Sequence, residues 1–439
     1  MDVSVFRSSI RHIPMSSLMD KAFDWFFYTF VFITVFLPGG SIYGVNFKYP
    51  LYVGLLPLAA YALFQRRQAH AGQLALLLAV PAILSGWMIL GLSHGFSVPS
   101  VARQYTDILL TLLLCWLAGV SCDQKDVRRL AFLKLILYSE LATAVLKIGL
   151  IVYAVVRGIP VVQMVLWLDT VFGVELMTMD LGALFGRVQF ISDELIPICI
   201  FILLRYRDRL RISHIWAALM IVLLLASVLF SFSRYFWGFT AFAFFLGLVL
   251  GKRDKFQAVL VAVLGLTILA SLPALVAVYK LRFSTEVAGG SDQQRNAQIP
   301  ALEHFFIEAP IFGHGLGSYT TEDIRGTTEA GRASYEVQLL ALPAQIGLAG
   351  MCFFIVLGAF YYRALWWKSS LHLSDQVSLL LLLAFWLAAG LTNPLIFHPI
   401  AGVNYATLAT LSAMGLKGRP FARRSASLLH ATGSEHDLV

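Results

Sequence analysis

Long, nearly uninterrupted blocks of apolar residues are the feature that most restricts what this chain can fold into. Of its 439 residues, 59% are apolar and 13% are charged, whereas soluble domains average about a quarter charged residues. Such blocks are typical of a polytopic helical membrane protein. The composition therefore excludes an ordinary soluble protein, a disordered chain and a fibrous one.

A membrane-spanning helix requires about 20 mostly apolar residues, so the blocks predict an all-α polytopic membrane protein with one integral domain over residues 1–439. A basic segment precedes the first block but no small-residue cleavage site follows it, so this block is predicted to be a retained helix rather than a signal peptide. We predict about twelve spans, at residues 22–38, 50–65, 73–93, 104–121, 130–156, 190–205, 214–232, 235–251, 256–279, 344–366, 376–392 and 400–416.

Lysine and arginine residues in alternate connections predict the orientation, because cytoplasmic connections are enriched in them. Arg66 and Lys252 lie in such connections, which places both termini in the cytoplasm and residues 425–439 in a mobile polar tail. Two outer connections are long, at 157–190 and 281–335. The second separates the ninth and tenth spans and is predicted to contain short surface helices.

Several kinds of chemistry are excluded by what the sequence lacks. The cytoplasmic connections are too short for a nucleotide-binding domain, and the chain has no P-loop, no Rossmann glycine pattern and no Asp-x-Asp pair. No metal site or cofactor is predicted, and the net charge of +8 is attributed to membrane orientation rather than to nucleic-acid binding. Four cysteines form no CxxC pair, so neither a disulfide framework nor a zinc site is expected: Cys115, Cys122, Cys199 and Cys352.

The long connection 281–335 contains two motifs. Apolar residues recur at helical spacing from Asn296 to Glu308, which predicts a short amphipathic helix on the membrane surface, reached through a flexible segment at 288–292 and ended by Pro310. Alternating glycines then follow at positions 313, 315 and 317, and they permit tight turns and close backbone approach. The alternative is a plain turn between helices.

Glu336 lies just before the tenth predicted span. If this segment is helical, Glu336 and Gly347 share one face, because eleven residues are close to three helical turns. Pro343 predicts a kink or the true start of the helix. The carboxylate is either a solvated group near the positive end of the helix dipole or a general base.

Three arginines, Arg187, Arg234 and Arg295, stand on the predicted outer side. A single arginine at this level is usually an interfacial anchor. Three of them favour an anion site instead, because guanidinium groups bind phosphate in a bidentate manner. Inside the fifth span, Glu140 and Lys147 are expected to find partners within the bundle, and a proton or ion pathway is the alternative.

Several pieces together resemble the O-antigen ligase and polysaccharide polymerase superfamily of bacterial inner membranes. The resemblance covers the chain from about 187 to 350, whereas the first half matches in topology only. The pieces share an order and a predicted outer location: Phe232-Ser-Arg234 at a helix start, Arg295 before the surface helix, Pro310-Ile-Phe-Gly-His-Gly-Leu-Gly-Ser-Tyr319, and Glu336 followed by Gly347 and Gly350.

The resemblance implies a glycosyltransferase. Members of this superfamily move a glycan from an undecaprenyl-diphosphate carrier to an acceptor on the periplasmic face, without a metal or a nucleotide. Because the ligases usually carry a histidine where this chain has Glu336, the chain looks more like an exopolysaccharide or capsule repeat-unit polymerase. An O-antigen polymerase, an O-antigen ligase and a protein-glycosylating ligase follow as alternatives. The implied partners are the lipid-linked donor, the growing glycan, a chain-length regulator and an export complex.

On this assignment Glu336 is the general base, and direct attack by the acceptor hydroxyl implies inversion at the anomeric carbon. The leaving diphosphate would be bound by Arg187, Arg234 and Arg295, with Arg282 in reserve. The residues expected to line the site are His314, Tyr319, Tyr335 and His398. Two other classes stay open: a transporter or flippase of lipid-linked glycans that uses Glu140 or Lys147 for coupling, and a non-catalytic scaffold of an export complex.

Overall fold

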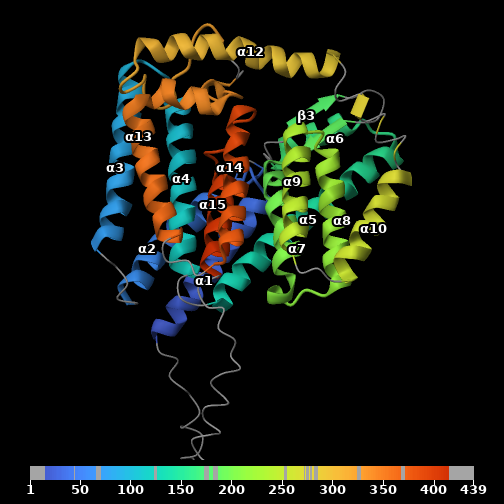
Figure 1. The fold of residues 1–439 in the computed structure, drawn as a ribbon. Coiled ribbons are helices and arrows are strands. Elements are labelled where there is room, and N and C mark those ends of the chain that lie inside the picture. Colours follow the sequence, from blue (N-terminus) through green and yellow to red (C-terminus); the bar gives the residue numbers. More distant parts are fainter. Residues whose placement is uncertain are drawn as a thin grey trace, which may run out of the picture.

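The computed structural model of the chain is a bundle of roughly parallel and antiparallel helices with two short β-hairpins (Figure 1). Arg282 and the predicted tail 425–439 lie outside the residues that the structure describes. The described residues are 15–43, 45–65, 71–122, 126–172, 177–180, 186–251, 255–270, 272, 276, 279–280, 285–323, 328–366 and 371–414.

Each predicted span coincides, in whole or in part, with a helix of the bundle. These helices are α1 (Met15–Phe36), α2 (Lys48–Gln65), α3 (Ala71–Ser93), α4 (Val98–Cys122), α5 (Asp126–Arg157), α7 (Ile196–Leu210), α8 (His214–Phe230), α9 (Arg234–Leu250), α10 (Lys255–Ala270), α13 (Gln338–Trp366), α14 (Leu373–Leu387) and α15 (Pro399–Met414).

Four helical stretches among the described residues are long and apolar enough to cross a membrane, by length and composition. They are Val98–Cys122, Asp126–Arg157, Gln338–Tyr361 and Leu373–Leu391. The prediction of a helical membrane protein is supported to this extent, but these criteria give four spans rather than about twelve. Several other helices fall short: α7, α8, α9, α10 and α15 have 15 to 17 residues, fewer than the roughly 20 that a span requires.

Several short elements connect the helices of the bundle. The helix α6 (Val161–Phe172) is followed by the antiparallel hairpin of β3 (Met177–Asp180) and β4 (Gly186–Gln189), in which Met177 pairs with Gln189. The first hairpin joins β1 (Ser41–Ile42) to β2 (Val45–Asn46). Both hairpins are short, and the mostly helical structure fits the predicted all-α class. The described residues also include three short 3₁₀ turns: η2 (Ile191–Leu195), η3 (Glu329–Gly331) and η4 (Ala388–Leu391).

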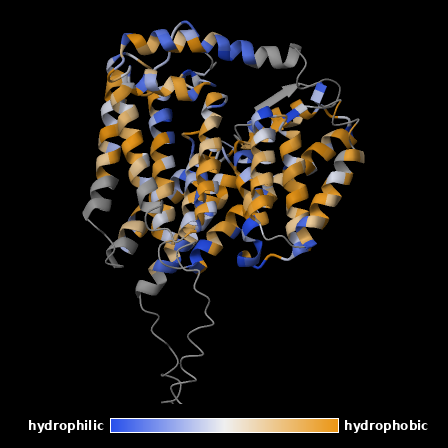
Figure 2. Cartoon of the chain, viewed as in Figure 1, coloured by the Kyte–Doolittle hydropathy of each residue, from blue (hydrophilic) through white to orange (hydrophobic). Residues whose placement is uncertain are grey.

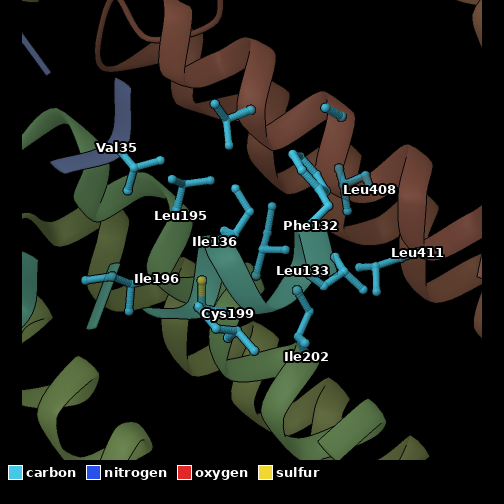
Figure 3. Close-up of a cluster of buried hydrophobic side chains, with 14 of the residues drawn as sticks. Val35, Phe132, Leu133, Ile136, Leu195, Ile196, Cys199, Ile202, Leu408 and Leu411 are labelled. Carbon is cyan, nitrogen blue, oxygen red and sulfur yellow. The ribbon is translucent and has the colours of Figure 1, made fainter. Parts of the chain in front are cut away.

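The main apolar core lies where α1, α5, α7 and α15 meet (Figure 3). Phe132 and Ile136 of α5 pack there with Cys199 of α7 and Leu411 of α15, and all four side chains are fully buried. Leu195, the last residue of η2, belongs to the same cluster. The core therefore fixes η2 and the start of α7 against the middle of α5.

The helix α12 (Thr285–Glu308) lies across one end of the bundle, here called the α12 end (Figure 1). Polar colouring gathers on α12 and at the opposite end, while the helices between are mostly apolar (Figure 2). The predicted short helix over 296–308 was wrong in extent, because α12 has 24 residues and includes the supposedly flexible segment 288–292. Asp292 within these added turns is held by two arginines, which stabilises the extension.

Arginines hold the opposite end of the bundle together. Arg128 at the start of α5 lies 2.7 Å from Asp24 of α1. Arg129 donates to the carbonyl of Ala413 near the end of α15, and Arg205 of α7 forms a bidentate pair with Asp375 of α14. The start of α1 and the end of α15 therefore lie at the same end of the molecule.

Candidate functional site

The turn between α8 and α9 places Arg234 at the α12 end. Phe232 in this turn has φ of +47°, a left-handed conformation that residues other than glycine rarely adopt and that clusters at functional sites. Ser233 then caps α9, because its hydroxyl accepts a hydrogen bond from the Phe236 amide at 3.4 Å. Arg234 consequently begins α9 and extends from its first turn to α12.

Arg234, Asp292, Arg295 and Glu336 form a continuous network of alternating charge. Arg234 grips the Asp292 carboxylate with both Nη atoms, at 2.6 and 3.2 Å. Arg295 donates from Nη1 to the same carboxylate at 2.8 Å, and its Nε lies 3.0 Å from Oε2 of Glu336. Two cations and two anions balance here, and an anionic ligand would have to compete with Asp292 for the guanidinium groups.

Glu336 is the more shielded of the two carboxylates. Its side chain is 13% exposed, compared with 47% for Asp292. The Glu336 amide donates to Oε1 of the buried Gln298 at 3.0 Å, which fastens the segment before α13 to α12. The carboxylate is thereby held beside Arg295.

Arg187 reaches the same turn from β4. Its Nε donates to the carbonyl of Ser231 at 3.1 Å, three residues before Arg234, and its Nη2 donates to the side chain of Gln189. Three of the four predicted cations are therefore gathered around α12 and the α8–α9 turn. Among the described residues, no group of three or more His, Cys, Asp or Glu side chains is arranged to hold a metal ion.

Residues 310–317, here called the glycine loop, contact α13 at a break in that helix. Gly347 has φ of +66° and ψ of −176°, which interrupts the helix. Helices broken in this way need other partners for the freed backbone groups. Four backbone hydrogen bonds of 2.8 to 3.1 Å supply them, from Leu348 to Pro310, Ala349 to Ile311, His314 to Ala344 and Gly315 to Gln345.

This arrangement corrects the predicted geometry of the tenth span. Because the helix is interrupted, Glu336 and Gly347 do not share one face, and the break falls at Gly347 rather than at Pro343. The glycine admits the loop instead of a neighbouring helix, since a Cβ on Gly347 would lie 2.3 Å from the Ile311 carbonyl oxygen. The loop is therefore a structural part of α13 and not a plain turn.

His314 and Tyr319 hold the loop to α12 and its surroundings. The His314 ring stacks on Phe305 with centroids 3.7 Å apart, and its Nε2 donates to the Phe305 carbonyl at 2.8 Å. The Tyr319 hydroxyl accepts from Nη1 of Arg332 at 3.1 Å. These contacts position the loop, and the expected role of both residues in lining a site stays a prediction.

Tyr335 and His398 also make structural contacts. Tyr335 precedes Glu336 and is buried, and its hydroxyl accepts from the Thr320 amide at 2.9 Å. Burial raises the pKa of the Tyr335 phenol, so this group stays protonated. His398 lies at the start of α15, where its Nδ1 accepts from the Ile400 amide at 3.4 Å and its carbonyl accepts from Thr111.

Two members of the site were missed by sequence reasoning. Asp292 stands three residues before Arg295, a spacing that puts them on one helical face, but the prediction of a flexible segment at 288–292 left this pair out. Gln298 carries no signal of its own, because its importance depends on contact with Glu336 across 38 positions.

Comparison of the chain with protein-family models, with curated proteins and with solved structures finds no match in any of the three. The resemblance to the polymerase and ligase superfamily therefore depends on the sequence motifs alone.

Proposed function

We propose that this protein is a glycosyltransferase that polymerises exopolysaccharide or capsule repeat units from an undecaprenyl-diphosphate-linked donor. In this proposal the chain crosses the bacterial inner membrane about twelve times, with both termini in the cytoplasm and residues 281–335 in the periplasm. The observation that carries it is the network of Arg234, Asp292, Arg295 and Glu336, in which a shielded carboxylate is paired with Arg295 and Arg295 shares Asp292 with Arg234.

The arginines serve the leaving group. A departing lipid diphosphate develops negative charge that fixed cations stabilise. Its phosphates replace the Asp292 carboxylate on Arg234 and Arg295, because a diphosphate offers more charge and more acceptor oxygens than one carboxylate. Arg187 supplies a third cation from β4.

Glu336 serves the acceptor. It takes the proton of the sugar hydroxyl as the acceptor oxygen forms its bond to the anomeric carbon, while the bond from that carbon to the diphosphate oxygen breaks. The electron pair leaves with the diphosphate, and the configuration at the anomeric carbon inverts. Engagement of Arg295 by the diphosphate releases the Glu336 carboxylate from its ion pair and frees it to accept the proton.

A transporter of lipid-linked glycans is the second candidate. A specific observation favours it, since four ionisable side chains are fully buried within the bundle, where transporters commonly keep coupling groups. An O-antigen ligase, which would use the same network on a different acceptor, is the third.

Purified protein in proteoliposomes, supplied with lipid-linked repeat units and, in a parallel assay, with lipid A core as acceptor, separates these functions. Longer lipid-linked glycans support the polymerase, and transfer to lipid A core supports a ligase. Movement of unaltered donor across the bilayer supports a transporter. If none of these occurs with folded, membrane-inserted protein, the proposal is overturned in favour of a scaffold.

A further inference from the structure

A second set of charged side chains lies inside the bundle. Glu140 and Lys147 of α5 meet Asp193 and Glu194 of η2, and all four side chains are fully buried. Glu140 stands about 21 Å along α5 from Asp126, at 1.5 Å per residue, so it lies near the middle of one of the four membrane-length helices. Ionisable groups at such depth are rare and mark functional sites.

Lys147 and Asp193 satisfy each other. Nζ of Lys147 lies 2.8 Å from Oδ2 of Asp193 and also donates to the carbonyl of Ser227 at 2.8 Å. Oδ2 of Asp193 accepts from the Phe190 amide at 3.0 Å. The pair is neutral overall, because the positive charge of Lys147 balances the negative charge of Asp193.

Glu140 and Glu194 are not balanced in this way. Their four carboxyl oxygens are buried, and none of them makes a hydrogen bond of normal geometry among the described residues, although Ser192 stands next to Glu140. Ionisation of both would place two further negative charges beside Asp193 in a low-dielectric interior. A buried charge without a partner carries a large desolvation penalty, and protonation removes it.

The groups that face this cluster from neighbouring elements do not supply the missing charge. They are the hydroxyl of Ser227 in α8, the thiol of Cys199 in α7, the phenols of Tyr235 in α9 and Tyr405 in α15, and the guanidinium of Arg187 in β4. Of these groups Arg187 is the cation, and its guanidinium is bonded to Ser231 and Gln189.

We propose that Glu140 and Glu194 form a proton-binding site inside the bundle, in which each carboxyl group holds a proton at neutral pH. The ligand is the proton rather than a metal ion, because no group of three or more carboxylate, His or Cys side chains in the described part of the chain is arranged to hold one. This inference does not depend on glycosyl transfer.

The site is connected to the α12 end through the backbone. β4 carries Arg187 and leads through Phe190 into η2, and Asp193 holds the Phe190 amide at this junction. Loss of a proton from Glu140 or Glu194 adds repulsion against Asp193 and therefore strains the junction that positions Arg187. Proton occupancy thus acts on one of the three arginines of the candidate site.

Infrared spectroscopy of the purified, membrane-reconstituted protein tests the proposal. A protonated carboxyl group has a C=O stretching band that a carboxylate lacks, and the band shifts in deuterated water. We expect this band at neutral pH, with a further shift when glutamate but not aspartate is labelled with ¹³C. Glu140→Gln and Glu194→Gln should each remove part of it, and the double substitution should remove it. The matched control is Glu303→Gln, at an exposed position of α12, which should leave the band unchanged.

The labelling experiment needs no variant, so the proposal stays testable if a substitution prevents folding. A wild-type spectrum without the glutamate band overturns it, and so does a band that survives in a folded double variant. Carboxylate bands that respond to added sodium, with no protonated band present, overturn it in favour of a cation site. None of these infrared measurements depends on glycan transfer, so they test the proton site even if the proposed function is wrong.

Discussion

At the scale of single residues, Glu336 differs from the exposed carboxylates around it because it is shielded, fixed and paired. Its backbone is held by Gln298 and its carboxylate by Arg295. An isolated acid at a helix start would be solvated and free to rotate. These are the contacts that a positioned general base requires, and substitution of the carboxylate tests this role.

We predict that Glu336→Gln lowers glycan transfer by roughly a hundredfold or more, the usual scale for loss of a general base. Glutamine keeps the size and hydrogen-bonding ability of the side chain but cannot accept the proton. Glu336→His should retain part of the activity if basicity at this point is sufficient. Rates of chain extension in proteoliposomes, with donor binding measured separately, check the prediction.

Glu303→Gln is the matched control, because Glu303 lies on the exposed side of α12. It should transfer at the parental rate. A Glu336→Gln variant that also extends glycans at that rate would exclude Glu336 as the base, and His398 or His314 would then be tested.

The arginines lead to a second prediction at this scale. Arg234→Lys and Arg295→Lys should each lower transfer roughly ten- to a hundredfold, the scale of a lost hydrogen bond to a charged group, with little effect on thermal stability. Lysine keeps the charge but loses the planar fork. Arg234 uses both Nη atoms on one carboxylate, and Arg295 uses Nη1 and Nε on two carboxylates.

Arg103→Lys is a suitable comparison, since Arg103 is partly exposed on α4 and contacts Asp107 at only 3.9 Å. Transfer and melting temperature should both be close to parental. Near-normal transfer by both site variants would show that Arg234 and Arg295 do not bind the diphosphate and would favour their interpretation as interfacial anchors.

At the scale of elements, the contact between the glycine loop and α13 shows how a break can be stable in a membrane-length helix. The loop and the break exchange backbone hydrogen bonds in both directions, so the backbone groups freed around Gly347 find partners. Gly315 and Gly317 bring the same loop against α3 and α4, where Cβ atoms would meet the backbone of Gly91 and Val101. One loop therefore joins three helices beneath α12.

We predict that Gly347→Ala destabilises the protein by at least about 1–3 kcal/mol, the cost of a residue held in an unfavourable backbone conformation. Its positive φ and the contact of a Cβ with the Ile311 carbonyl both oppose alanine. Thermal unfolding in detergent measures the loss. Gly358→Ala, in the same helix with open space around its Cβ, should be neutral or slightly stabilising. Equal melting temperatures for the two variants would contradict this account.

The sequence predicted where the helices lie because about 20 apolar residues leave few alternatives to a helix. It did not predict the break at Gly347, since that break depends on a loop more than 30 residues earlier in the chain. Pro343 attracted the prediction of a kink because its local chemistry is visible in the sequence. Asp292 was missed because its segment was predicted to be flexible, and because its second partner, Arg234, lies 58 positions away in the chain.

At the scale of the whole molecule, the two ends of the bundle differ in how their arginines are paired. The arginines at the opposite end, such as Arg128 and Arg205, pair with acids on neighbouring helices, whereas Arg234 and Arg295 at the α12 end share the carboxylate of Asp292. Because α1 begins and α15 ends at the same end, the arrangement suits an even number of crossings. Which end faces the cytoplasm is decided by labelling.

We predict that the α12 end lies outside the cytoplasm, because the connections rich in lysine and arginine are at the other end. In a cysteine-depleted background, Thr321→Cys is exposed in the loop after α12 and should react with an impermeant thiol reagent on intact spheroplasts. Ser318→Cys, three residues earlier, is buried and should react only after denaturation. Asp208→Cys, at the end of α7, is exposed at the other end and should react only once the cells are opened. Labelling in the reverse order would place the arginine–carboxylate network in the cytoplasm, where a periplasmic transfer reaction could not use it.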